Sequence, residues 1–326
     1  MRSVSIIVPE HAVLSCIIDA KRLFAFANQF LKEKGVDNFF EVQLVGFIRQ
    51  ISFDKGAHII QVDKTLEDAG YSDLIIVPAI SGDVIRGTQL NRHYFPWLIE
   101  QHKKGAEIAS FCVGAFIVAA TGLLDGKQCS THWAYANELA AYYPGIRLVN
   151  DKIITEQSGI YSSGGGTSYW NLLLYLLEKY TSRQIVIAAT KYFLLDIARN
   201  SQSAFVMFKG QKEHGDKLVG QVQVFIENNY RGKINIEKMA AEFSIVRRTL
   251  ERRFKKATKN SIAEYIQRIK IEAAKKEIEM GRKTINEVMY ELDYSDKKAF
   301  KELFLRITGL TPIEYKKKYG TERCSN

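Results

Sequence analysis

The stretches Leu250-Glu251-Arg252-Arg253-Phe254 and Phe300-Lys301-Glu302-Leu303-Phe304 decide how the last third of this 326-residue chain folds. They lie 50 residues apart, and each has large apolar side chains at positions i and i+4, on one face of a helix. Two adjacent bases precede each stretch, Arg247-Arg248 in one copy and Lys297-Lys298 in the other. Each copy also follows a short segment with helical periodicity. The pattern therefore predicts two copies of a helix–turn–helix unit.

Capping residues define where the predicted helices begin. In Thr284-Ile285-Asn286-Glu287 the spacing predicts a capping box, in which the Thr hydroxyl and the Glu carboxylate accept from unpaired backbone N–H groups. Asn235 is expected to cap the matching helix over residues 236–243. Ser295 is expected to cap the second basic helix, which would then start at Asp296. The predicted core residues are Met239, Leu250 and Phe254 in the first copy and Ile285, Val288, Met289, Leu292, Phe300 and Phe304 in the second.

A basic helix that follows a tight turn is the arrangement that enters the major groove of DNA. Arg makes bidentate contacts with guanine, whereas Lys more often neutralises a phosphate. We therefore expect the first copy to contact bases and the second to anchor the backbone. A helix predicted over residues 262–281 joins the copies, and its length of about 30 Å is close to one turn of duplex. The predicted DNA-contacting residues are Arg247, Arg248, Glu251, Arg252, Lys255, Lys297, Lys298 and Lys301.

Neighbouring positions on a helix point in different directions, so Arg252 and Arg253 are not both expected to face the groove. The charge distribution supports the DNA-binding prediction. Residues 216–326 hold 25 Lys/Arg against 16 Asp/Glu, a net charge of +9, and the rest of the chain holds 21 against 20. A basic module attached to a neutral one is typical of proteins that bind polyanions. The alternative, a basic surface that only keeps the protein soluble, does not explain the helix–turn–helix pattern.

The first 200 residues alternate short apolar runs with helical stretches, which predicts a parallel sheet with helices on both faces. Residues 201–216, which lack periodicity, are predicted to form a docked linker, and residues 217–320 the DNA-binding domain, followed by a tail over 321–326. The predicted strands cover residues 4–8, 42–47, 57–61, 74–77, 107–111, 153–156 and 160–163. The predicted helices of this part cover residues 18–34, 91–104, 114–121, 133–142, 168–179 and 184–199.

Cys112 lies between an apolar strand and a helix that begins with small residues, in Ser110-Phe111-Cys112-Val113-Gly114-Ala115. This order predicts a nucleophile elbow, a tight turn at a helix N-terminus where the helix dipole favours a thiolate. His132 is the candidate partner base. Ligands of open α/β sheets bind beyond the carboxyl ends of the strands. The predicted ligand pocket therefore consists of Cys112, Val113, Gly82, His132 and Gly165.

The C-terminal domain resembles the AraC/XylS family of transcription regulators over about residues 217–319. The resemblance implies two helix–turn–helix units that bind double-stranded DNA. This chain departs from the family pattern at Val246, where a Ser cap is usual, at Asp293, where the turn residue is usually Gly, at Glu302, where Arg is usual, and at Leu305, where Lys is usual. The resemblance rests on residues 248–255, on Tyr265-Ile266-Gln267-Arg268-Ile269-Lys270-Ile271-Glu272-Ala273-Ala274, and on Phe300 through Gly309-Leu310-Thr311-Pro312-Ile313-Glu314-Tyr315.

The N-terminal half resembles the PfpI/ThiJ superfamily, which is related to class I glutamine amidotransferases, and within it the sensor half of GlxA-type regulators. The residues that carry the resemblance are Cys112-Val113-Gly114-Ala115-Phe116, Thr121-Gly122-Leu123-Leu124-Asp125-Gly126-Lys127 and Thr131-His132-Trp133. It implies a flavodoxin-like sandwich and a sensor of small nitrogenous metabolites such as amino acids or betaines. Protease-like members carry His directly after the Cys, where this chain has Val113, so we expect no catalysis. A cysteine-dependent hydrolase or glyoxalase-like enzyme that uses Cys112 and His132 is the alternative, and a purely structural dimerisation domain is another.

Several classes of protein are disfavoured by what the sequence lacks. No apolar run reaches the roughly 18 residues that a membrane span needs. The four cysteines show no CxxC spacing, and His11, His58, His93, His102 and His214 show no metal-ligand spacing. We therefore expect a cytoplasmic protein without metal or cofactor, and the family resemblance suggests a homodimer.

Overall fold

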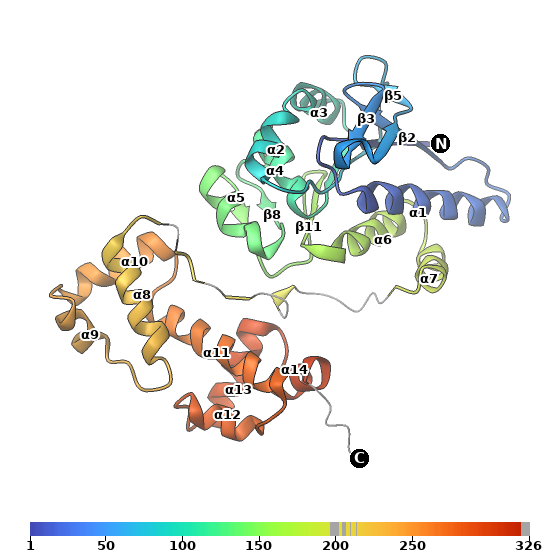
Figure 1. Ribbon diagram of the computed structural model, residues 1–326. Coiled ribbons are helices and arrows are strands. Elements are labelled where there is room, and N and C mark those ends of the chain that lie inside the picture. Colours follow the sequence, from blue (N-terminus) through green and yellow to red (C-terminus); the bar gives the residue numbers. More distant parts are fainter. Residues whose placement is uncertain (196–201, 204–206, 209, 213, 321–326) are drawn as a thin grey trace. The chain divides into compact units, whose positions relative to one another are not determined.

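The structure, a computed structural model, describes residues 1–195, 202–203, 207–208, 210–212 and 214–320 (Figure 1). The chain divides into two units, Met1–Gln202 and Ser203–Asn326. The predicted tail with Cys324, the end of the helix predicted to reach Arg199 and parts of the predicted linker lie outside the described residues. No helix among the described residues has the length and apolarity to cross a bilayer.

The first unit is built on a seven-stranded sheet in the order β10-β11-β7-β6-β1-β2-β5. Neighbouring strands pair in parallel, except that β10 runs antiparallel to β11 at the edge. All four residues of β6 and of β11 are buried, as expected for strands covered on both faces. The predicted parallel sheet is confirmed except at this edge, where β10 is antiparallel. The strands are β1 Arg2–Ile7, β2 Phe40–Gly46, β5 Lys64–Thr65, β6 Leu74–Val77, β7 Glu107–Ser110, β10 Ile154–Gln157 and β11 Ile160–Ser163.

Helices cover both faces of this sheet (Figure 1). On one face α1 (Leu14–Lys32) packs against α6 (Tyr169–Tyr180) and α7 (Arg183–Tyr192). On the other, α4 (Ala115–Ala120) packs against α2 (Val84–Leu90) and α3, which spans Tyr94–Lys103. A shorter helix, α5 (Ala136–Tyr142), lies in the segment between the two-residue strands β8 (Gln128–Cys129) and β9 (Arg147–Leu148).

One predicted strand does not belong to the parallel sheet. The segment predicted over residues 57–61 forms β4 (His58–Gln61), which pairs antiparallel with β3 (Gln50–Phe53) in a separate hairpin. Three of the four β4 residues are exposed, which suits a hairpin and not a strand covered on both faces. Apolar content alone could not distinguish the two, so the expectation that this segment joins the alternating parallel pattern was wrong.

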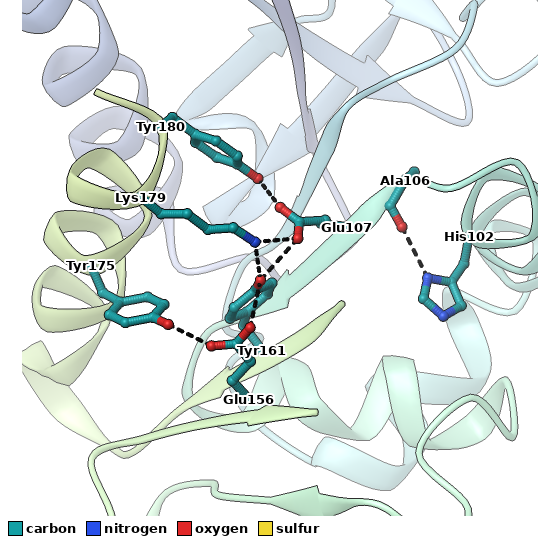
Figure 2. Close-up of polar contacts among 8 residues, drawn as sticks. All are labelled: His102, Ala106, Glu107, Glu156, Tyr161, Tyr175, Lys179 and Tyr180. Atoms are coloured by element: carbon teal, nitrogen blue, oxygen red, sulfur yellow. Dashed lines mark hydrogen bonds and ion pairs between the residues drawn. The ribbon is translucent and has the colours of Figure 1, made fainter. Parts of the chain in front are cut away.

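A polar network fastens α6 to the sheet (Figure 2). Glu107, the first residue of β7, accepts hydrogen bonds from Lys179, Tyr161 and Tyr180. Glu156 accepts from the hydroxyls of Tyr161 and Tyr175, 3.0 Å away in the case of Tyr161. Partial burial raises the pKa of Glu107, but hydrogen bonds from the Lys179 ammonium and from the hydroxyls of Tyr180 and Tyr161 outweigh it and hold that pKa below its usual range. The network therefore joins α6 to β7, β10 and β11 through the carboxylates of Glu107 and Glu156.

The second unit consists of helices (Figure 1). α11 contributes to two apolar cores, one around Leu250 and Phe254 and one around Phe300 and Phe304. Each predicted core residue is buried apart from Ile285, which packs partly buried against the second core. Both predicted helix–turn–helix units are therefore present. The helices are α8 Lys217–Asn229, α9 Ile236–Glu242, α10 Arg247–Thr258, α11 Ile262–Met280, α12 Ile285–Glu291, α13 Lys297–Thr308 and α14 Pro312–Tyr319.

The internal repeat extends beyond the helix–turn–helix units. Tyr265 donates to Glu227 at 2.9 Å, and Tyr315, 50 residues later, donates to Glu279 at 2.6 Å. The helices that carry these tyrosines begin with matching capping boxes, at Ser261 in α11 and at Thr311 in α14. Each copy thus contains four helices, and α11 is the last helix of the first copy and the first helix of the second.

The caps agree with the sequence in two cases and differ in one. Asn235 and Thr284 cap α9 and α12 as predicted. Ser295 does not cap α13: the carboxylate of Asp296 accepts from the backbone N–H groups of Lys298, at 2.8 Å, and Ala299, at 3.2 Å. The helix therefore begins one residue later than predicted, because a carboxylate at the N-cap is hydrogen-bonded there and also interacts favourably with the helix dipole.

Candidate DNA interface and candidate ligand site

The basic helix α10 presents a stripe of three exposed cations. Arg248, Arg252 and Lys255 are exposed and follow one another at spacings of four and three residues, so they share one face. Arg247 and Glu251, also predicted to contact DNA, form an ion pair at 3.0 Å, and Arg247 reaches Glu237 of α9 at 3.2 Å. These ion pairs join α9 to α10, the two helices of the first helix–turn–helix copy. Arg248, Arg252 and Lys255 remain as the exposed cations of the stripe on α10.

Arg253 has a different role from its neighbour Arg252. Its guanidinium makes a two-pronged contact with Asp216, at 2.7 and 3.0 Å. Asp216 also caps α8 by accepting from the N–H of Val219. The guanidinium holds the pKa of the Asp216 carboxyl below its usual range. Arg253 therefore fixes α10 to the start of α8, and Arg252 is the member of the pair left on the stripe.

The second basic helix, α13, carries a chemically different stripe. The positions that match Arg248, Arg252 and Lys255 are Lys298, Glu302 and Leu305, and all three are exposed. One cation and one anion stand where α10 has three cations. Lys297, Lys298 and Lys301 are exposed at the start of α13, where they can reach a phosphate.

A buried lysine that was not among the predicted site residues supports the turn of the second helix–turn–helix copy. Lys270 of α11 donates to the carbonyl of Leu292 at 2.8 Å, and its ammonium lies 5.3 Å from the centre of the Tyr294 ring. Burial lowers the pKa of Lys270. The residue between them, Asp293, has a positive φ of 61°, and Ser244 at the matching turn has a φ of 51°. Lys270 thus holds a turn that lacks the glycine such a backbone favours.

Cys112 sits on a strained turn directly after β7, with a φ of 54°. Its backbone N–H donates to the Ser163 hydroxyl at 3.2 Å, and its carbonyl accepts from the Thr131 hydroxyl at 3.0 Å. A Cβ on Gly114 would lie 2.4 Å from the carbonyl oxygen of Pro78, so the helix after Cys112 can approach β6 only with glycine there. The predicted elbow geometry is therefore present.

The surroundings of the Cys112 thiol disfavour its thiolate form. Burial raises its pKa, and hydrogen bonds from the backbone N–H groups of Val113 and Gly166 offset this only in part. A thiol that stays protonated at neutral pH is a poor nucleophile. The Val113 side chain itself is buried in the core, so this residue contributes its backbone. Two further cysteines are buried: Cys16, whose pKa burial raises to about 12, and Cys129, whose pKa it raises to about 11.

His132 is arranged as a structural group. Its ring packs directly on Gly165, where a Cβ would meet the ring Cδ2 at 2.1 Å. Nδ1 accepts from the backbone N–H of Ala134 at 3.1 Å, which places the proton of the neutral ring on Nε2. Burial lowers the pKa of His132, so the ring is neutral at pH 7. In this tautomer the Nδ1 lone pair is engaged by the Ala134 N–H, and Nε2 is a hydrogen-bond donor.

Gly82, the remaining predicted pocket residue, follows β6 with a φ of 80° and open space at its α-carbon. Its neighbour Ser81 lines a cavity of about 300 Å³ that the sequence did not indicate. The cavity also borders Glu10 and His93, whose ring stacks on Phe47 with centres 3.9 Å apart. The structure thus brings Cys112, His132 and Gly165 together, while Gly82 lies beside a cavity lined by other residues. In the described part of the chain, no three His, Cys, Asp or Glu side chains are grouped as a metal-binding set.

Comparisons with known proteins assign both units. The model of a family described as "Helix-turn-helix domain" matches residues 239–318, and the DJ-1/PfpI family model matches residues 26–179. The HTH-type transcriptional regulator GbdR of Pseudomonas aeruginosa is 23% identical over 312 residues, 95% of this chain and 83% of its own length. The HTH-type transcriptional regulator GlxA of Rhizobium meliloti is 20% identical over 219 residues, 67% of each chain.

A solved structure shows the same fold. The crystal structure of an AraC family transcriptional regulator from Pseudomonas putida superposes with a TM-score of 0.50 at 16% identity, covering 59% of this chain and 100% of the other. At that identity the likeness concerns the fold alone. The two family matches and the likeness to named regulators assign the protein: the chain is a DNA-binding transcriptional regulator that joins a DJ-1/PfpI domain to a helix–turn–helix domain.

Proposed function

We propose that this regulator recognises a specific DNA site through the Arg248-Arg252-Lys255 stripe of α10 and uses α13 as a phosphate anchor. The observation that carries the proposal is the difference between the two stripes, three cations in α10 against Lys298, Glu302 and Leu305 in α13. Arg is suited to guanine contacts, and an exposed Glu repels nearby phosphates. Only base contacts give a large ratio of specific to non-specific affinity.

Selection of genomic DNA fragments by the purified full-length protein at physiological salt tests this assignment. We expect an enriched two-part motif with its halves about one helical turn apart. Arg248→Ala or Arg252→Ala should then cost about 1–3 kcal/mol of binding to that motif. Recovery of fragments without a motif, or unchanged affinity in both variants, would contradict the assignment of α10.

We further propose that the DJ-1/PfpI domain, residues 1–200, binds a small nitrogenous metabolite beside Cys112 and does so without catalysis. The protonated thiol and the Nε2–H tautomer of His132 favour a binding site over a reaction centre. Titration calorimetry against a panel of amino acids and betaines tests the idea, with Cys112→Trp as the variant that fills the site. Absence of binding across the panel, together with normal regulation in Cys112→Trp, would exclude the sensor.

A second function, a cysteine-dependent hydrolase or glyoxalase-like enzyme, is favoured by one observation, the strained elbow backbone at Cys112. Strained residues of this kind cluster at active sites. Turnover of ester, amide or glyoxal substrates that disappears in Cys112→Ser would establish the enzyme, and its absence leaves the sensor.

We also propose that the protein acts in the cytoplasm, on the nucleoid, as a homodimer. Supporting the dimer, α1 and α7 pack together and expose Ile18, Ile187 and Tyr192. Exposed apolar side chains on neighbouring helices can contribute to an association surface. Light scattering during size-exclusion chromatography gives the mass in solution, and a monomer at micromolar concentration would refute this part.

A further inference from the structure

The last residue of the first unit, Gln202, is buried with 3% of its surface exposed. Its side-chain Nε2 donates to the carbonyl of Thr131 at 3.0 Å and to that of Asn150 at 2.8 Å. Its Oε1 accepts from the N–H of Gly165 at 3.2 Å. The carboxamide of Gln202 thus uses both N–H groups and its carbonyl oxygen, and it bonds to the backbone of three loops, at Thr131, Asn150 and Gly165. The backbone N–H of Gln202 adds a fourth bond, to the carbonyl of Asp151 at 3.0 Å.

Two of these loops also build the proposed ligand site. The hydroxyl of Thr131 donates to the carbonyl of Cys112, and Gly165 supports the ring of His132. A Cβ on Gly164 would lie 2.9 Å from Oε1 of Gln202, so glycine is needed there to admit the carboxamide. The Gln202 side chain therefore occupies a shaped cradle that shares its walls with the Cys112 site.

Three described residues further along the chain, Phe208, Lys212 and Asp216, contact helices of the second unit. The N–H of Phe208 donates to Glu272 of α11 at 3.1 Å, and the Phe208 ring lies 5.1 Å from that of Tyr265. Lys212 pairs with Glu227 of α8 at 2.6 Å. Asp216 then holds Arg253 on the recognition helix α10. Only residues 203–207 separate Gln202 from the first of these residues, Phe208.

We propose that Gln202 is a latch that transmits the state of the Cys112 site to the DNA-binding unit. The inference rests on the proposed ligand site and adds its route of regulation. Hydrogen bonds weaken steeply when donor and acceptor move apart or tilt, so the carboxamide holds only while the loops of Thr131, Asn150 and Gly165 keep their spacing. A ligand that shifts the Thr131 or Gly165 loop frees Gln202, and the contacts of Phe208, Lys212 and Asp216 with the second unit pass the change to α10.

Gln202→Glu is the sharpest perturbation, because it keeps the shape and replaces the donor NH₂ with a carboxylate oxygen that faces the carbonyls of Thr131 and Asn150. Gln202→Ala, which removes the contacts without adding repulsion, is the second variant. Gln89→Glu is the matched control, since Gln89 is an exposed glutamine of α2 in the same unit. Hydrogen–deuterium exchange of the full chain, followed by mass spectrometry, needs neither ligand nor operator. We expect exchange in peptides that contain Asn150-Asp151 and Gly164-Gly165 to rise at least tenfold in both Gln202 variants and to stay unchanged in the control.

Transmission is measured by the affinity for a 40-base-pair duplex that carries the selected motif, or for a random duplex if selection yields none. We expect Gln202→Glu to change this affinity at least fivefold, and Cys112→Trp to change it in the same direction. In the double variant, Cys112→Trp should change the DNA affinity by less than a further twofold, because Gln202→Glu has already removed the contacts that transmit the change. Unchanged hydrogen–deuterium exchange in both Gln202 variants would refute the latch. Changed exchange with unchanged DNA affinity would mean that Gln202 only stabilises the loops of the first unit and transmits nothing. Failure of the metabolite panel alone would refute the ligand assignment and leave both of these measurements standing.

Discussion

Glu107→Gln is the substitution whose consequence the structure predicts most closely. The carboxylate accepts from Lys179, Tyr161 and Tyr180, and its side chain is 22% exposed. Glutamine keeps one acceptor oxygen and loses the charge. Tyr161 retains its bond to Glu156, so the loss falls on the Tyr180 hydroxyl and the Lys179 ammonium (Figure 2). Hydrogen bonds to charged groups contribute about 1.5–3 kcal/mol each, and partial exposure of this pair reduces the figure. We therefore expect Glu107→Gln to destabilise the first unit by about 2 kcal/mol.

Tryptophan fluorescence measures this unit alone, because Trp97, Trp133 and Trp170 are the three tryptophans of the chain and all precede residue 202. For a unit of this size about 2 kcal/mol corresponds to a fall of roughly 4–8 °C in melting temperature. Lys179→Met, which leaves the Tyr180–Glu107 bond in place, should cost less.

The pH dependence gives the prediction a second test. The pKa of Glu107 is lowered in the folded state, so its stabilisation is complete above the unfolded value near 4.5 and is lost as the pH falls through the folded pKa. The difference between wild type and Glu107→Gln should therefore be constant from pH 7 to about 5.5 and shrink in more acidic buffer. Equal melting temperatures at pH 7, or a difference that grows on acidification, would refute the reasoning.

Other predictions concern the DNA-binding unit and Cys112. Lys298→Ala should lower the affinity for all DNA sequences alike and reduce the slope of log K against log salt by about 1. Arg252→Ala should instead lower mainly the affinity for the selected motif. If Arg252→Ala weakened binding to the motif and to random duplexes equally, the division of roles between α10 and α13 would be contradicted. Asp296→Ala should destabilise the second unit by about 1 kcal/mol in thermal melts followed by circular dichroism, and Ser295→Ala should not, because the aspartate is the cap. Alkylation of Cys112 by iodoacetamide should be slow at pH 7 and accelerate above about pH 9, since burial raises the pKa of the thiol; fast labelling at neutral pH would show an activated cysteine.

Much of the candidate DNA interface was predictable because its determinants are local. The spacing of Leu250 and Phe254 fixes which face of α10 is buried, and the cations on the opposite face follow from helical geometry. The same reasoning predicted the core of the second helix–turn–helix copy and the cap at Thr284. It failed at Ser295, where two adjacent residues could both cap and only backbone geometry shows that Asp296 does.

The ligand site was less predictable, since its groups come from separate strands. Sequence could place Cys112 on an elbow after a buried strand, yet the His132 tautomer depends on the backbone N–H of Ala134, and the fit of its ring depends on the missing side chain of Gly165. The hairpin of β3 and β4 and the cavity beside Ser81 likewise depend on strand pairing that apolar content does not specify.

The two-part architecture, the duplicated helix–turn–helix unit and the neutral and basic halves were predictable from the chain alone, because periodicity, capping and charge act over a few residues. The ion pair of Arg253 with Asp216, the attachment of α6 by Glu107 and the binding of Gln202 among the loops around Cys112 became visible only in the folded molecule. Hydrogen bonds and ion pairs between residues far apart in the chain are set by how the packed elements meet, and a glutamine in an aperiodic segment gives no local signal of the cradle that holds it.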